Sequence, residues 1–135
     1  MATRYFTPEE ANEALEAVRP LAESMVAHRR ALARAEARRA ELTERIASNG
    51  GDIQPSELAE ATTELEEEAT GVARCIQAIT ELGALVKDLD RGLVDFPARH
   101  GDREVLLCWQ LGEEEVAHWH GADEGFAGRR PLPLD

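Results

Sequence analysis

Residues 55–86 read PSELAEATTELEEEATGVARCIQAITELGALV, and this stretch decides the fold. Its apolar residues recur every seven positions, at Leu58, Leu65, Val72, Ile79 and Val86. A repeat of this kind is typical of a coiled coil, because it keeps one apolar stripe of a helix facing a partner helix. The sequence therefore predicts a helix over about residues 56–83, capped by Ser56.

The segment before this helix predicts its partner. Thr7 offers a capping hydroxyl, Pro8 suits the first helical position, and Glu10 stands three residues after Thr7, which is the pattern of a capping box. Apolar residues then recur at close to seven-residue spacing as far as Ile46. Pro20 has no amide donor inside this run, so we expect a kink or a restart of the helix there.

A cluster of turn residues, Ser48-Asn49-Gly50-Gly51-Asp52, separates the two helices. Helices over about residues 7–47 and 56–83 would form a long antiparallel hairpin. Arginines on the first helix and glutamates on the second lie at matching distances from the turn, so opposite charges are expected along the seam. The expected ion pairs are Arg45 with Glu57, Arg38 with Glu64, and Arg34 with Glu68.

The last third of the chain, residues 84–135, has a different pattern. Its helical period gives way to short apolar pieces separated by turn signals, which predict a small antiparallel sheet. The expected strands are 93–96, 105–109 and 116–119, while residues 84–86 would finish the second helix and 129–133 would form an extended tail. The predicted fold class is α+β, mainly α, with a helical domain over 1–83 and a β-rich module over 84–135.

Two helices with one apolar stripe each cannot enclose a core. Either the C-terminal third folds back on the helices, or two hairpins associate into a four-helix bundle, and the heptads favour the second arrangement. The sequence thus predicts a homodimer.

Composition excludes several classes of function. The 135 residues include 27 Asp+Glu against 15 Lys+Arg, a net charge of -12, which argues against a nucleic-acid partner because phosphate binding needs cations. No apolar run reaches the roughly 18 residues of a membrane span, and the N-terminus lacks the apolar stretch of a signal peptide. We expect a soluble cytoplasmic protein without a membrane partner, in which Cys75 and Cys108 are free thiols.

Several short motifs resemble a known family. They are Val86-Lys87-Asp88-Leu89-Asp90, Gly92-Leu93-Val94-Asp95-Phe96-Pro97, Leu107-Cys108-Trp109, Leu111-Gly112-Glu113, Trp119-His120, Gly125-Phe126 and Gly128-Arg129, with Phe6 and Ala11-Asn12 near the start. Through them the chain resembles an uncharacterised bacterial family, domain of unknown function family 2203, over nearly its whole length. The resemblance implies a bacterial origin and a shared site, but no activity, cofactor or substrate. His118 departs from the family pattern, in which an aromatic residue is more typical.

The same region holds candidate metal ligands. His118 and His120 are two residues apart, so on a strand both imidazoles point to one face, a spacing that can chelate a transition metal. Cys108 would add a thiolate, and Glu113 or Asp95 a carboxylate, giving a mixed set that suits zinc or another late first-row ion. The alternative is that the histidines are ordinary strand residues and that Cys108 is a small buried hydrophobic residue.

A ligand site is the other reading of these residues. The candidates for it are Asp90, Asp95, Trp109, Glu113 and Arg129. Arg129 would pair with one of the acids or meet an anionic ligand, whereas Trp109 also suits the core of the sheet.

Three classes of function remain open, and the sequence favours the first. They are a non-enzymatic dimer that binds a small molecule or a protein partner, a transition-metal-binding protein, and a small hydrolase or transferase working through Asp95, Cys108 and His120. No Gly-x-Ser-x-Gly elbow and no glycine-rich phosphate loop occurs, so whether the protein is an enzyme is not decided by sequence.

Overall fold

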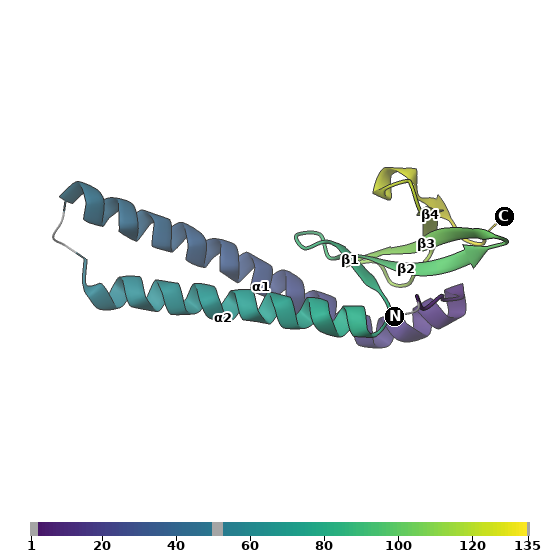
Figure 1. The fold of residues 1–135 in the computed structure, drawn as a ribbon, viewed down its shortest axis with the longest axis horizontal. Helices are drawn as coiled ribbons and strands as arrows, with labels where there is room; N and C mark the ends of the chain where they lie inside the picture. The colour runs from purple at the N-terminus through teal and green to yellow at the C-terminus, as the bar shows by residue number, and fades with distance from the viewer. Residues whose placement is uncertain (1–2, 50–52, 135) are drawn as a thin grey trace.

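The computed structural model describes residues 3–49 and 53–134. Helix α1 (Pro8–Asn49) and helix α2 (Pro55–Glu81) lie side by side as an antiparallel hairpin (Figure 1). The predicted hairpin is confirmed, and α1 includes Ser48 and Asn49, the first two residues of the expected turn. Gly50, Gly51 and Asp52 of that turn lie outside the described residues.

The start of α1 is the predicted capping box. The Glu10 amide donates to Thr7 Oγ1 at 3.1 Å, and the Thr7 amide donates to Glu10 Oε1 at 2.9 Å. Of the kink or restart expected at Pro20, the restart is wrong, because α1 is one continuous helix through that residue, and the kink stays a prediction. A single missing amide donor removes only one bond of the ladder, and the buried neighbours Ala22 and Met25 hold the next turn against the core.

The start of α2 differs from the prediction. Gln54, rather than Ser56, is the cap residue, and Pro55 occupies the first helical position. The Gln54 amide donates to Glu57 Oε2 at 3.2 Å, which is half of a second capping box.

Five strands follow the hairpin and form one antiparallel sheet in chain order. They are β1 (Leu85–Asp88), β2 (Leu93–His100), β3 (Arg103–Gln110), β4 (His118–Gly121) and β5 (Arg130–Pro131), with a short 3-10 helix η1 (Phe126–Gly128) before the last. The expectation that residues 84–86 finish the helix is wrong. Gly83 adopts a φ of 95°, which favours glycine, and turns the chain out of α2 into β1.

The two faces of the sheet are unlike. The inner face lies on the helices, where its alternate residues join residues of α1 and α2 in the core. The largest contributions from the sheet are Phe96, Leu107, Trp109 and Trp119, and those from the helices include Val18, Met25 and Ile79. The C-terminal third therefore folds back on the hairpin, the first of the two arrangements that the sequence left open.

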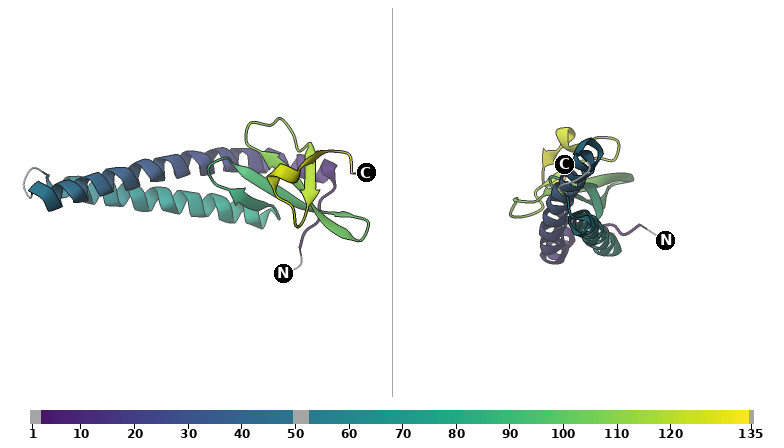
Figure 2. Two further views of the ribbon diagram at one scale, coloured as in Figure 1. Left: turned by 90° about the horizontal axis from the view of Figure 1, so that it is seen from above. Right: turned by 90° about the vertical axis from the view of Figure 1, so that its left-hand side faces the viewer.

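The sheet covers only one end of the hairpin, and the other end projects beyond it (Figure 2). Along the projecting end, small and apolar residues such as Ala35, Leu42 and Ala61 are buried in the seam between the helices. The expected ion pairs between α1 and α2 are wrong: among the described residues, Glu68 pairs with His28 at 2.6 Å, and the pairs expected for Arg34, Arg38 and Arg45 do not form. Flexible exposed side chains gain little from such pairs, so packing at the seam decides their positions.

Both cysteines are buried and free, as predicted. In the part of the chain that the structure describes, neither long helix carries an apolar stretch sufficient to cross a membrane.

Candidate metal centre

Three chemically active side chains meet on the outer face of the sheet, away from the helices. They are Asp95 of β2, Cys108 of β3 and His120 of β4, which come from three neighbouring strands. Asp95 lies directly opposite Cys108, and His120 stands two residues along β4 from the partner of Cys108, so alternation places all three on one face. Their ligand atoms lie within 4.8 Å of one another, and each residue is at most 3% exposed.

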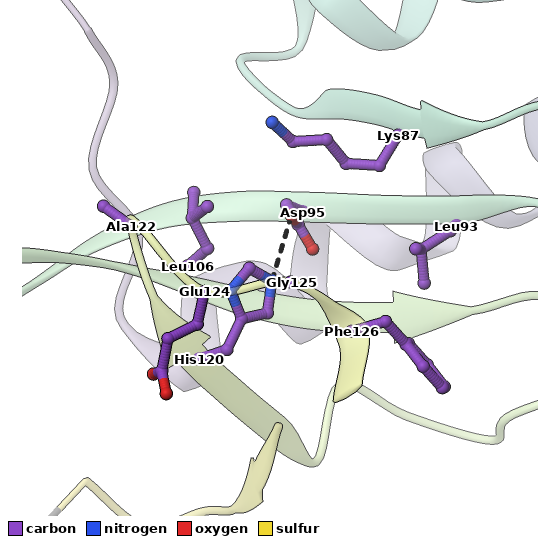
Figure 3. Close-up of a pocket in the computed structure, with 9 residues that line it drawn as sticks. All are labelled: Lys87, Leu93, Asp95, Leu106, His120, Ala122, Glu124, Gly125 and Phe126. Carbon is purple, nitrogen blue, oxygen red and sulfur yellow. Dashed lines mark hydrogen bonds and ion pairs between the residues drawn. The ribbon is translucent and has the colours of Figure 1, made fainter. Parts of the chain in front are cut away.

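The His120 ring is oriented by two contacts. Its Nδ1 lies 2.9 Å from the Gly121 carbonyl oxygen, and because a carbonyl only accepts, Nδ1 carries a proton and donates it. Nε2 is thereby turned toward Asp95 Oδ2, at 3.2 Å (Figure 3). A histidine held in this way offers the Nε2 lone pair to a metal ion.

The Asp95 carboxyl has one oxygen without a partner. Oδ2 meets His120, but Oδ1 is buried and has no hydrogen bond among the described residues. Burial raises the pKa of Asp95, partly opposed by the nearby His120 ring. An unpartnered buried carboxyl oxygen is destabilising by itself, so a further group that binds it would stabilise the site.

The Cys108 thiol is held in its protonated form. Burial, together with the Asp95 carboxyl beside it, raises the pKa of Cys108 to about 12. A fully buried thiol with this pKa is a poor nucleophile, because the thiolate is the reactive species. A bound cation would reverse the effect, since coordination to a metal deprotonates a thiol outright.

A cavity of about 210 Å³ lies next to this group, between the outer face of the sheet and residues 122–126. Asp95 and His120 line it, together with the apolar residues Leu93, Leu106 and Phe126 and the cationic residue Lys87 (Figure 3). The three residues are therefore buried in the protein, but two of them border a space large enough for a small molecule.

The other two predicted metal ligands form a separate group beside Cys108. Arg129 Nη2 donates to both carboxylate oxygens of Glu113, at 3.0 and 2.9 Å, and to His118 Nδ1 at 2.6 Å. The Arg129 guanidinium thus engages both carboxylate oxygens of Glu113 and the Nδ1 atom of His118. It also lies over the Phe126 ring, 4.6 Å from its centroid, so this group holds η1 against the sheet.

The structure places the remaining predicted ligand residues elsewhere. Trp109 is fully buried on the helix side of the sheet, where its Nε1 donates to the Glu113 carbonyl oxygen. Asp90 is exposed in the turn between β1 and β2 and pairs with Arg29 of α1 at 3.2 Å. Sequence reasoning did not single out Lys87, although it stands in the motif Val86-Lys87-Asp88-Leu89-Asp90 and is the only lysine of the chain.

A family model covers almost the entire chain. The model of the uncharacterized conserved protein DUF2203 matches residues 4–132 of 135. The chain belongs to this family. The resemblance drawn from the short motifs is confirmed, and in this DUF2203 chain the three residues of the outer face, the cavity and Lys87 all lie within the matched range. No curated protein and no solved structure matches the chain.

Proposed function

We propose that this protein binds a transition-metal ion, zinc foremost, through Asp95, Cys108 and His120. The observation that carries the proposal is the convergence of three buried ligand atoms, from three neighbouring strands, within 4.8 Å. Thiolate, imidazole and carboxylate are ligands that zinc accepts in proteins, whereas calcium and magnesium prefer oxygen alone.

One distance within the group suits a tetrahedral ion. Zinc bonds to nitrogen and oxygen of about 2.0 Å at a tetrahedral angle place those two atoms about 3.3 Å apart. His120 Nε2 and Asp95 Oδ2 are 3.2 Å apart, so that edge of the site needs almost no adjustment. The bond from His120 Nδ1 to the Gly121 carbonyl is the kind of outer contact that orients metal-binding histidines.

The charges also favour a dication. The Cys108 thiolate and the Asp95 carboxylate together balance two positive charges, and His120 binds as a neutral ring. Without an ion, the same burial keeps a proton on the thiol and leaves Asp95 Oδ1 unpaired. A reducing compartment such as the cytoplasm suits the proposal, because the thiol must stay unoxidised to coordinate.

The metal-binding reading now stands ahead of the other two classes. For a hydrolase in which Cys108 attacks a substrate, the thiol is too deeply buried and too weakly acidic. For a ligand site, four of the five sequence candidates are dispersed over a core position, an exposed turn and the Arg129–Glu113 pair, and Asp95 alone of the five borders the cavity.

Elemental analysis of purified protein, dialysed against zinc and then against buffer without chelator, tests the proposal. We expect close to one zinc per chain in the wild type and loss of the ion in His120→Ala. His118→Gln is the matched control, because it alters a histidine two residues away on the same strand and should leave the ion bound. A folded wild type that holds no zinc would refute the proposal, as would retention of zinc by His120→Ala.

We also propose that the projecting end of the hairpin pairs with a second copy of this chain, forming a four-helix bundle. The sheet does not cover that end (Figure 2), and it carries complementary charges on its two helices. The arginines of α1 from Arg30 to Arg45 make no ion pair with α2 among the described residues. In a two-fold pair aligned at their turns, each α1 would meet the glutamates of the other α2, from Glu57 to Glu67.

Sedimentation equilibrium at low and high salt tests this arrangement. We expect a dimer at low salt that weakens at high salt, because exposed charges are screened. Replacing Arg34 and Arg38 by Glu should give a folded monomer, and combining that change with Glu64→Arg and Glu67→Arg should restore the dimer. A wild type that stays monomeric at millimolar concentration would overturn the proposal.

A further inference from the structure

Lys87 is the only lysine in a chain with fourteen arginines, and it stands at the cavity beside the metal centre. The two cations differ in chemistry. Lysine carries a compact point charge on a flexible stem, whereas the planar guanidinium of arginine is broader and donates in a fixed fork. In a chain that otherwise uses arginine throughout, this position carries the smaller ammonium.

The backbone directs this side chain. In the pairing of β1 with β2, Val86 lies opposite Val94 and Asp88 lies opposite Leu93, so Lys87 is an extra residue without a partner. Such a bulge re-aims a side chain, and bulges are frequent next to functional sites. The Lys87 side chain lines the same cavity as Asp95 and His120 (Figure 3), and it makes no ion pair within the described residues.

Coordination chemistry leaves one position to fill. Three protein ligands around a tetrahedral ion leave a fourth, as in zinc sites that bind a water molecule or a substrate. Here Asp95 and His120 border the cavity, so the cavity gives a small molecule access to an ion held by these residues. Because the thiolate and the carboxylate already neutralise a dication, an anion in this position adds one unbalanced negative charge. The ammonium of Lys87 supplies the single positive charge that balances it.

The rest of the cavity is apolar or already paired. Leu93, Leu106 and Phe126 form apolar walls. Glu124, the acidic residue at the rim, accepts hydrogen bonds from the Gly121 amide at 2.8 Å and from Arg130 at 3.0 Å, so its charge is engaged. The volume of about 210 Å³ corresponds to about seven water molecules at about 30 Å³ each, which is room for a few carbon atoms behind one charged group.

We propose that the cavity binds a small monocarboxylate, whose carboxylate fills the open position on the metal and pairs with Lys87, while its short apolar body packs on Leu93, Leu106 and Phe126. The inference rests on the proposed metal site. A single negative charge fits better than the two charges of phosphate, because one ammonium is available to balance it.

Cobalt(II) in place of zinc provides the measurement, since the visible absorption of tetrahedral cobalt responds to a change of its fourth ligand. The probes are propionate, its neutral isostere propionamide and inorganic phosphate, titrated into the cobalt-loaded wild type, Lys87→Met and Lys87→Arg. Arg74→Met, which removes a cation on α2 far from the cavity, is the control variant.

We expect propionate to shift the spectrum saturably and propionamide to leave it unchanged. Lys87→Met should bind one cobalt per chain but weaken propionate at least tenfold, Arg74→Met should behave as wild type, and Lys87→Arg should bind propionate more weakly than wild type. Equal propionate affinity in wild type and Lys87→Met would overturn the role of Lys87, and a response to phosphate without one to propionate would overturn the carboxylate assignment. If the wild type takes up no cobalt, the metal site itself is refuted and this inference falls with it, whereas cobalt uptake without any anion response refutes the inference alone.

Discussion

Gly71 of α2 faces the His28 ring of α1, and this contact gives a prediction whose sign opposes helix propensity. A methyl group added at Gly71 would stand 2.7 Å from both Cγ and Nδ1 of His28, well inside the roughly 3.5–4.0 Å of normal contact. The ring cannot move away freely, because its Nδ1 lies 2.6 Å from Glu68 Oε2. Gly71 is therefore the residue that lets the two helices approach at this point.

The magnitude follows from three contributions. Replacing glycine by alanine inside a helix stabilises it by about 1 kcal/mol. Overpacking costs about 1–3 kcal/mol, and loss of the bond between His28 and Glu68 removes about 0.5–1.5 kcal/mol. We expect Gly71→Ala to lower the free energy of unfolding by about 0.5–3.5 kcal/mol, measured by urea denaturation followed by circular dichroism.

A double-mutant cycle isolates the cause. In a His28→Ala background the ring is absent, so Gly71→Ala should stabilise the protein by about 1 kcal/mol, as helix propensity alone predicts. The reasoning is refuted if Gly71→Ala stabilises the wild type by that amount, because the helices would then not be in contact at Gly71.

Three further predictions concern the fold. Glu10→Gln should reduce the fall in the free energy of unfolding at acid pH. The hydrogen bond from the Thr7 backbone lowers the pKa of Glu10, so the carboxylate stabilises the protein above its ordinary pKa. This stabilisation is lost as pH falls through the lowered pKa. Urea titrations at pH 7, 5 and 3 check this, and an unchanged difference between wild type and variant would contradict it. Phe96→Ala should destabilise by about 3–5 kcal/mol, because Phe96 is fully buried and its ring meets Phe6 edge-on at 5.3 Å; a loss below about 1 kcal/mol in the same assay would show that the sheet does not pack on this core. Leu65→Asp, on the projecting end of α2, should dissociate or unfold the assembly, because it places a charge without a partner in the apolar seam. If light scattering shows an unchanged folded species, Leu65 does not lie in that seam.

The helical hairpin could be predicted because its signals are local. The seven-residue spacing from Leu58 to Ile79 and the capping pattern at Thr7 each depend on a few neighbouring residues. The turn at Gly83 that begins β1 was missed, because a glycine between apolar residues does not by itself distinguish the last turn of a helix from its end. The predicted ion pairs of Arg34 and Arg38 are wrong, because exposed charged side chains have several possible partners of nearly equal energy.

The sequence also predicted most of the candidate ligands, but not which of them lie together in the structure. His120 and Cys108 were candidates by residue type and strand alternation, with Asp95 as one of two carboxylates. The choice of Asp95 over Glu113 depends on the register of β2 on β3, which pairs Asp95 with Cys108 and leaves Glu113 beyond the end of β3. Register is a property of the whole sheet, and the bulge that directs Lys87 is a one-residue irregularity of that register.

Strand β4 is short, and on one of its sides it has little pairing with another strand. Its four residues pair with β3 on one side and with only the two residues of β5 on the other. An ion held by Asp95, Cys108 and His120 would join β4 to the two longest strands by bonds that do not depend on the backbone ladder. Amide hydrogen exchange in β4 and protease cleavage after Gly121 would then slow together when the protein binds the ion. The ion would thus stabilise the C-terminal segment in the position in which this segment covers the metal site.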